Sequence, residues 1–369
     1  MSKSESLCRT SSCSSDLAFI ALAAFALTGC KSIGPGTVPR DRFAYSDSIS
    51  DSWKRQTLLN IVKMRYFDPP IFVDVGQIVA GYSLETSLSA GGSISSAGAI
   101  QGNSATIGGA TKFTDRPTVT YTPLTGNKFV RALMMPLPPE SIFYTIQSGL
   151  PADGICLAAV GAMNGLKNQN VSISGISPAD PGFIRAVELL RKIQVSGAVG
   201  MRIRQDPQKP PTTVMTIRSQ DITGETLENI REFRRLLRLD EDAQEFKLYY
   251  GATSSSGTEI AMQTRSLLQI MGVFAAHAEI PPEDVAQGRA TPGLDNSSSE
   301  QDRLSMALIH SSKSKPSDAF VAVPYHGHWF WIADSDLKTK RVFAFMMMLF
   351  TLAETGEKEN LPVLTIPAQ

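Results

Sequence analysis

The stretch that decides the fold is residues 78–94, IVAGYSLETSLSAGGSI. Its even positions are mostly apolar and its odd positions are mostly small and polar, so the pattern repeats every two residues. A period of two is typical of a β-strand whose two faces meet different surroundings. The alternation resumes with the opposite parity after residues 95–103 and continues to Thr122. Together the two halves predict one long β-hairpin, at about residues 73–122, with a Gly/Ser/Ala/Asn-rich tip.

The predicted hairpin contains no charged residue between Glu85 and Lys112. Each arm is long enough to cross a bilayer as a tilted strand, but a single hairpin cannot cross alone because its edges would be unpaired in hydrocarbon. In water, an open strand edge can instead pair with a partner strand. The sequence therefore predicts a hairpin for membrane contact or assembly. The residues expected to serve it are Ile78, Tyr82, Leu84, Leu88, Ile94, Ile107 and Phe113.

The rest of the chain alternates helical patterns with short strand patterns. Helices are expected at residues 50–66, 125–135, 139–149, 152–166, 180–195, 225–239, 263–278 and 336–354. Strands are expected at residues 170–175, 198–204, 212–218 and 363–366, with hairpins at 246–262 and 318–333. These patterns predict an α+β fold of mixed helices and short antiparallel strands, with one long Gly/Ser-rich amphipathic β-hairpin.

Shifts in composition suggest four segments. They are a signal peptide at 1–29, a tether at 30–49, an N-terminal region with the long hairpin and helices at 50–170, and a C-terminal α+β domain at 171–369. Gly34, Pro35, Gly36 and Pro39 disfavour regular structure in the tether. A polar run at about 286–302 predicts a mobile surface loop in the C-terminal domain.

The N-terminus has the form of a secretory signal. An uncharged run at 17–29 follows Lys3 and Arg9, and it is too short to span a bilayer. It ends in Leu27-Thr28-Gly29-Cys30, which resembles the lipobox of bacterial lipoprotein precursors. The resemblance implies cleavage before Cys30 and its acylation with fatty acids such as palmitate. Because Lys31 follows and not Asp, it also implies a lipid anchor in the outer membrane, on the periplasmic face.

Charge and cysteine content exclude several functions. The chain has 35 Lys plus Arg and 35 Asp plus Glu, and this balance gives no long-range attraction to nucleic acid. Apart from Cys30, the mature chain would contain only Cys156, whose apolar neighbours predict a buried core residue. Phosphate-loop, paired-cysteine, zinc-protease and nucleophile-elbow motifs are absent. We therefore expect neither nucleic-acid binding nor a cofactor nor catalytic activity.

His326 and His328 are the one candidate metal site. Residues two apart on a strand project to one face, so both imidazoles could reach one ion, with Asp334 or Asp336 adding an oxygen. The alternative interpretation is a polar turn at His326-Gly327 between two strands.

The predicted function is a lipid-anchored, non-catalytic cell-envelope protein that acts through protein contacts. It would be a scaffold or assembly component that binds an envelope partner or associates with itself, for example through residues 78–121. One alternative is an oligomeric outer-membrane pore subunit. The other is a periplasmic enzyme assisted by a metal at His326 and His328.

Overall fold

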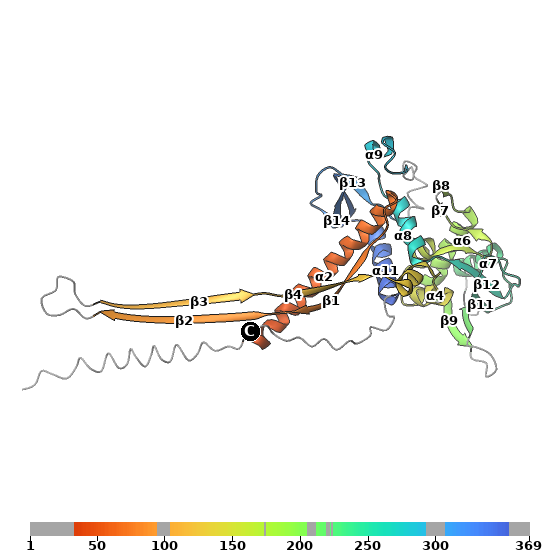
Figure 1. Ribbon diagram of the computed structural model, residues 1–369. Helices are drawn as coiled ribbons and strands as arrows, with labels where there is room; N and C mark the ends of the chain where they lie inside the picture. Colours follow the sequence, from red (N-terminus) through yellow and green to blue (C-terminus); the bar gives the residue numbers. More distant parts are fainter. Residues whose placement is uncertain are drawn as a thin grey trace, which may run out of the picture. The chain divides into compact units, whose positions relative to one another are not determined.

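Figure 1 shows a computed structural model of the protein, which describes residues 33–93, 104–172, 175–204, 212–218, 222, 224–292 and 307–353. Helices and mostly antiparallel strands form the predicted α+β fold. The chain divides into two compact units, one of residues 1–50 and 74–122 and one of residues 51–73 and 123–369. This division replaces the predicted boundary at residue 170, because strand β5 (Val160–Met163) pairs with β12 (Glu259–Thr264).

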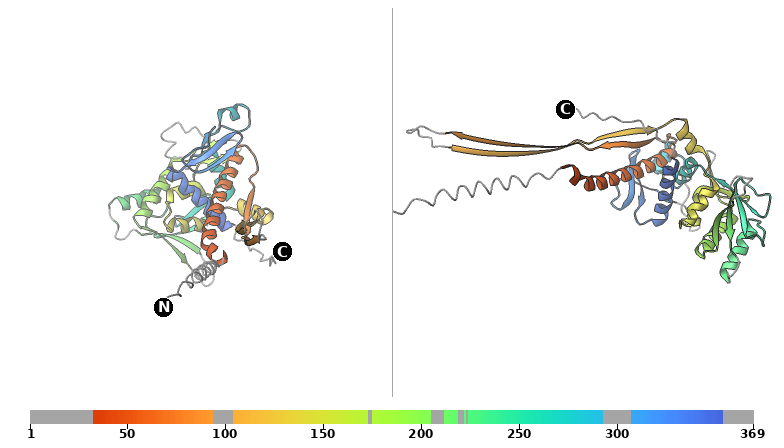
Figure 2. Two further views of the ribbon diagram at one scale, coloured as in Figure 1. Left: turned by 90° about the vertical axis from the view of Figure 1, so that its left-hand side faces the viewer. Right: turned by 90° about the horizontal axis from the view of Figure 1, so that it is seen from below.

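The first unit contains the long hairpin. Strands β2 (Tyr82–Ser93) and β3 (Ser104–Asp115) pair antiparallel from Tyr82↔Asp115 to Ser93↔Ser104 without a bulge. Figures 1 and 2 show the two strands as a long, narrow ribbon. The predicted tip at 95–103 and Ile94 lie outside the described residues. The long Gly/Ser-rich hairpin expected from the sequence is therefore present over its two arms.

Residues 78–94 alternate without interruption in the sequence, but they do not form a single strand, because β1 ends at Val79 and β2 begins at Tyr82. Strand β1 (Phe72–Val79) pairs with β4 (Thr118–Leu124) as a separate two-stranded sheet. The break falls where Gly81 faces Arg116, whose N–H donates to the Gly81 carbonyl at 2.9 Å. The next residue, Pro117, has no N–H and cannot continue the hydrogen-bond ladder, which explains why the two sheets separate here.

The predicted tether is also wrong over its described part, because helix α2 runs from Ile33 to Arg65. Pro35 lies in the first turn, where its missing N–H would have had no helical partner. Pro39 lies inside the helix and removes one helical hydrogen bond. Beside it, Arg40 and Asp41 both contact Tyr82 of β2, and these side-chain contacts support the helix where its sequence is weakest.

The second unit is built on a six-stranded sheet with the order β6-β5-β12-β11-β10-β9. Its remaining strands are β6 (Leu166–Lys167), β9 (Val199–Arg204), β10 (Thr212–Ile217) and β11 (Glu245–Tyr250). Its helices are α3 (Asn127–Met134), α4 (Pro139–Gln147), α5 (Ala152–Ala159), α6 (Pro181–Val195), α7 (Glu225–Leu236), α8 (Leu267–Ala276), α9 (Pro282–Ala286) and α11 (Leu337–Ala353). A short hairpin of β7 (Asn170–Ser172) and β8 (Gly175–Ser177) stands apart.

Two local predictions in this unit are wrong. The helix expected to run to residue 166 ends at Ala159, because the following residues form β5 against β12. Strands β11 and β12, expected as a hairpin, pair in parallel with Lys247 opposite Glu259. The segment between β11 and β12 leads back toward the start of β11, and the Gly257 carbonyl accepts a hydrogen bond of 2.9 Å from the Asp240 N–H there. β12 therefore starts beside the early part of β11 and runs in the same direction.

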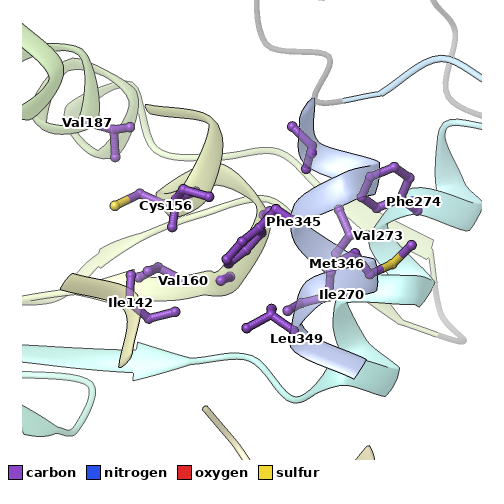
Figure 3. Packing of buried hydrophobic residues seen from close by; sticks show 14 of the residues in the cluster. Ile142, Cys156, Val160, Val187, Ile270, Val273, Phe274, Phe345, Met346 and Leu349 are labelled. Atoms are coloured by element: carbon purple, nitrogen blue, oxygen red, sulfur yellow. The ribbon is translucent and has the colours of Figure 1, made fainter. Parts of the chain in front are cut away.

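A three-stranded antiparallel sheet of the order β13-β15-β14 completes the unit. Its strands are β13 (His310–Ser312), β14 (Ala319–Tyr325) and β15 (His328–Ala333), so the predicted hairpin at 318–333 is confirmed. Helix α11 follows, and one face of it is buried in the core, as its apolar sequence predicts, whereas Leu337 and Met348 are exposed. Figure 3 shows Phe345 of this helix between the α5 side of the core, at Cys156 and Val160, and the α8 side, at Ile270 and Val273. The predicted strand at 363–366 lies outside the described residues.

Candidate functional site

The apolar face of the long hairpin is exposed. Directly opposed residues of an antiparallel pair lie on the same face, so the register combines the even positions of β2 with the odd positions of β3. Leu88 is 80% exposed, Phe113 is 54% exposed and Leu84 is 47% exposed. Leu84 lies opposite Phe113, and the rings of Tyr82 and Phe113 stack with centroids 6.0 Å apart. Large apolar side chains are thus presented to the surroundings along one face.

The opposite face of the hairpin is small and polar. Its residues are Ser83, Glu85, Ser87, Ser89, Gly91 and Ser93 on β2, with Thr106, Gly108, Ala110, Lys112 and Thr114 on β3. The Ser89 hydroxyl donates to the Gly108 carbonyl at 3.2 Å across the pair. A side chain at Gly108 would come within 2.9 Å of that hydroxyl, so the glycine makes room for it. Glu85 and Lys112 form an ion pair of 3.7 Å, and both are exposed.

The structure brings together most of the hairpin residues predicted from the sequence. Tyr82, Leu84, Leu88 and Phe113 share the apolar face. The backbone of Ile107 pairs with that of Ala90. Ile78 does not belong to the set, because it lies in β1 in the other two-stranded sheet. Ile94 lies outside the described residues.

The base of the hairpin is fixed to α2 within the first unit. The Tyr82 hydroxyl donates to Asp41 Oδ2 at 2.6 Å, and the Arg40 guanidinium lies 5.9 Å from the centre of the Tyr82 ring. The hydrogen bond to Asp41 raises the pKa of Tyr82 to about 12. The same bond, followed by the one from Arg40, lowers the pKa of Asp41. The sequence placed Asp41 in a tether, so it gave no signal for this contact.

His326 and His328 do not act as a pair. His326 has φ +47° and Gly327 has φ +78°, so both lie in the turn and not on a strand, and the prediction of a shared face is wrong. The His326 ring stacks on Tyr66, with centroids 4.9 Å apart. His328 Nε2 lies 3.1 Å from Glu283 Oε1. Positive φ at both turn residues is the geometry of a type I′ hairpin turn, which the alternative interpretation anticipated in part.

A buried carboxylate beside this turn was missed by sequence reasoning. Asp284 is fully buried and accepts hydrogen bonds from the Tyr66 hydroxyl at 2.5 Å and from Arg289 Nε at 2.9 Å. Burial acts to raise the pKa of Asp284, but the donors Tyr66 and Arg289 outweigh burial and lower it. Only chain folding joins Tyr66 to Asp284, 218 residues away, and no local motif marks the pair.

The predicted mobile loop at 286–302 is ordered in its described beginning. Arg289 binds Asp284, Ala290 is buried, and the Thr291 carbonyl accepts a hydrogen bond of 2.6 Å from Arg65. Residues 293–302 lie outside the described part of the chain.

Cys156 and the metal-ligating residue types are the remaining candidate groups among the described residues. Cys156 is fully buried, and burial raises its pKa to about 12, so the thiolate is disfavoured. Across the described ranges, no three or more His, Cys, Asp or Glu side chains are grouped so as to hold a metal ion. Over the same residues, no helix combines the length and apolar character needed to cross a bilayer.

The lipobox residues Leu27, Thr28, Gly29 and Cys30 lie outside the described residues, whose first member is Ile33. Comparison with known proteins finds no matching family model, no similar curated protein and no similar solved structure.

Proposed function

We propose that this protein is a non-catalytic, lipid-anchored component of the bacterial cell envelope that assembles with copies of itself through the β2–β3 hairpin. The lipid anchor is the acylated Cys30 of the lipobox. Outer-membrane attachment on the periplasmic face follows from Lys31 at the next position. The function would then be carried by protein contacts and not by a reaction.

The observation that carries the proposal is the isolation of the hairpin. In the described part of the chain, β2 and β3 pair only with each other, and both faces of the ribbon are exposed. A two-stranded ribbon alone is marginally stable in water, and its free edges bind other strands. Each strand has 12 residues, so two long strand edges are available to pair with further strands.

A second copy is the partner that the hairpin fits best. Its two arms have equal length and an unbroken register, so the outer edge of β3 in one copy matches the outer edge of β2 in the next. Glu85 and Lys112 stand at one level on opposite arms. Pairing of β3 with β2 of a neighbour therefore brings opposite charges together, whereas pairing two like edges would bring like charges together. The charges favour head-to-tail assembly.

Cysteine cross-linking between copies tests this proposal. One variant carries Thr86→Cys and a second carries Thr111→Cys, at positions that pair within one hairpin. Because each chain carries only one of the two cysteines, a cross-link between residues 86 and 111 must join two copies. The two variants are expressed together with different affinity tags and are treated with a short thiol cross-linker. We expect cross-linked dimers that contain one copy of each variant. Val195→Cys, at an exposed site in the second unit, is the control. Mixed dimers no more abundant than with Val195→Cys would contradict the proposal.

A further inference from the structure

The geometry of the first unit points to a membrane-spanning role for the assembled hairpins. We propose that the hairpins of several copies enter the bilayer that holds the Cys30 lipid and close into a β-barrel with a water-filled lumen. This inference rests on the proposed function, since it requires both the anchor and the self-association. It adds where the hairpin lies and what the assembly does.

The first argument is the level of the hairpin relative to the anchor. Three residue steps separate Cys30 from Ile33, the first residue of α2, and they span at most about 10 Å. Helical rise places Ile33 about 12 Å from Asp41, which binds Tyr82 at the base of β2. Figures 1 and 2 show that, within this unit, β2 and β3 continue past the N-terminal end of α2. About 25 Å of the 12-residue strand thus extends beyond the end of the helix that the lipid would hold at the membrane surface.

The second argument is where the charges stop. Glu85 and Lys112 lie three residues, or about 10 Å, beyond Tyr82 along the ribbon. The charged pair is therefore close to the level of the N-terminal end of α2. Past them, every described rung of the ribbon is uncharged, from Thr86↔Thr111 to Ser93↔Ser104. Tyr82 and Phe113 stack at the end of the ribbon that carries these charges. In membrane barrels, aromatic side chains are enriched at the same level, where the membrane meets water.

The third argument is the division between faces. Strands of membrane barrels alternate residues that face lipid with residues that face the lumen. Past Glu85 and Lys112, one face of the ribbon carries Leu88 and Ala90 with Thr86, Gly109 and Thr111, and the other face carries Ser87, Ser89, Gly91, Thr106, Gly108 and Ala110. The hydrocarbon core admits no open strand edge, so the free edges of β2 and β3 must be closed by neighbours. An aqueous lumen needs about 16 strands, which corresponds to about eight copies of the hairpin.

Thiol labelling of the full-length acylated protein in liposomes tests the orientation. Labelling of the native protein should be low because Cys156 is fully buried. Single variants Ser87→Cys, Leu88→Cys, Ser89→Cys and Ala90→Cys are treated with a charged, water-soluble methanethiosulfonate. We expect residues 87 and 89 to be labelled and residues 88 and 90 to be protected. Equal labelling of all four in an oligomeric sample would overturn the barrel and leave the self-assembly standing. A monomeric sample would refute the self-assembly and the barrel together.

Conductance in planar bilayers tests the lumen with matched neighbours on opposite faces. The wild-type oligomer should form stable channels in potassium chloride. Ser89→Lys should keep the channels and shift their selectivity toward chloride, because the new charge would line the lumen. Leu88→Lys should abolish channel formation, because the charge would face lipid. An oligomer without conductance, or equal effects of Leu88→Lys and Ser89→Lys, would overturn the inference.

Discussion

The Tyr82 hydroxyl donates a hydrogen bond of 2.6 Å to the Asp41 carboxylate, across 41 residues of sequence. Through it, the first residue of β2 is attached to the early turns of α2. Arg40 adds a contact with the same ring. The hairpin therefore extends from a fixed base within the first unit, and these side chains set its direction relative to the N-terminal end of α2.

Replacing Tyr82 by Phe should loosen this base. The ring is kept, but the hydrogen bond to Asp41 is lost, so amides of residues 36–44 should exchange faster with deuterium in Tyr82→Phe than in the wild type. Because the pKa of Asp41 is lowered, the contact is fully present above pH 3.8 and is lost as the pH falls through the depressed pKa of Asp41. Tyr121→Phe, at an exposed tyrosine of β4, is the control and should leave exchange in α2 unchanged.

The Tyr66–Asp284 hydrogen bond should stabilise the second unit. Tyr66→Phe keeps the ring against His326 but removes a donor to a fully buried carboxylate, which should lower the free energy of unfolding by about 1.5–3 kcal/mol. The matched variant Tyr325→Phe removes a more exposed hydrogen bond to Asp68, and it should cost less than about 1 kcal/mol. Urea unfolding measures both. Equal losses would show that burial of Asp284 adds nothing.

His277 should make the second unit sensitive to acid. Burial, together with the charges of Lys338 and Arg265, lowers the pKa of His277 to about 4. The neutral imidazole therefore contributes full stability above its ordinary pKa of 6.5, and the contribution is lost as the pH falls toward 4. Over that window the wild type should lose up to about 3 kcal/mol more than His277→Gln. Parallel unfolding curves for the two proteins at all pH values would exclude this role.

The proposed lipid anchor depends on one side chain, Cys30. Cells grown with radioactive palmitate should label the wild-type protein and should not label Cys30→Ser, which should also stay in the uncleaved form. Cys156→Ser is the control for acylation at the one cysteine that follows Cys30 in the sequence. Absence of label in both the wild type and Cys30→Ser would remove the basis for the envelope location.

The sequence predicted the parts of the fold that local periodicity determines. Alternation at residues 82–93 and 104–115 predicted the hairpin arms, and a helical period with Asp180-Pro181 at its start predicted α6. It failed where a long-range contact decided the outcome. Prolines at 35 and 39 argued against a helix that the Tyr82 contact supports, and the polar segment after Tyr250 looked like a hairpin turn although β11 and β12 are parallel.

The candidate site was predictable to a similar extent. The apolar face of the hairpin follows from residue order, because the pleat sends alternate side chains to opposite faces. His326 and His328 were misjudged because positive φ at His326 cannot be inferred for a histidine from its neighbours. The Asp284 cluster depends on bringing Tyr66 next to a segment 218 residues later, which no local pattern encodes.

The most direct test of the central claim is the mass of the native particle extracted in mild detergent. A matched variant replaces residues 86–111 by Asn-Gly, which favours a tight turn between the paired residues Glu85 and Lys112. The wild type should run as a complex of several copies, and the shortened variant should run as a monomer with an unchanged second unit. A wild-type monomer, or a complex of the same size in both proteins, would contradict assembly through the hairpin.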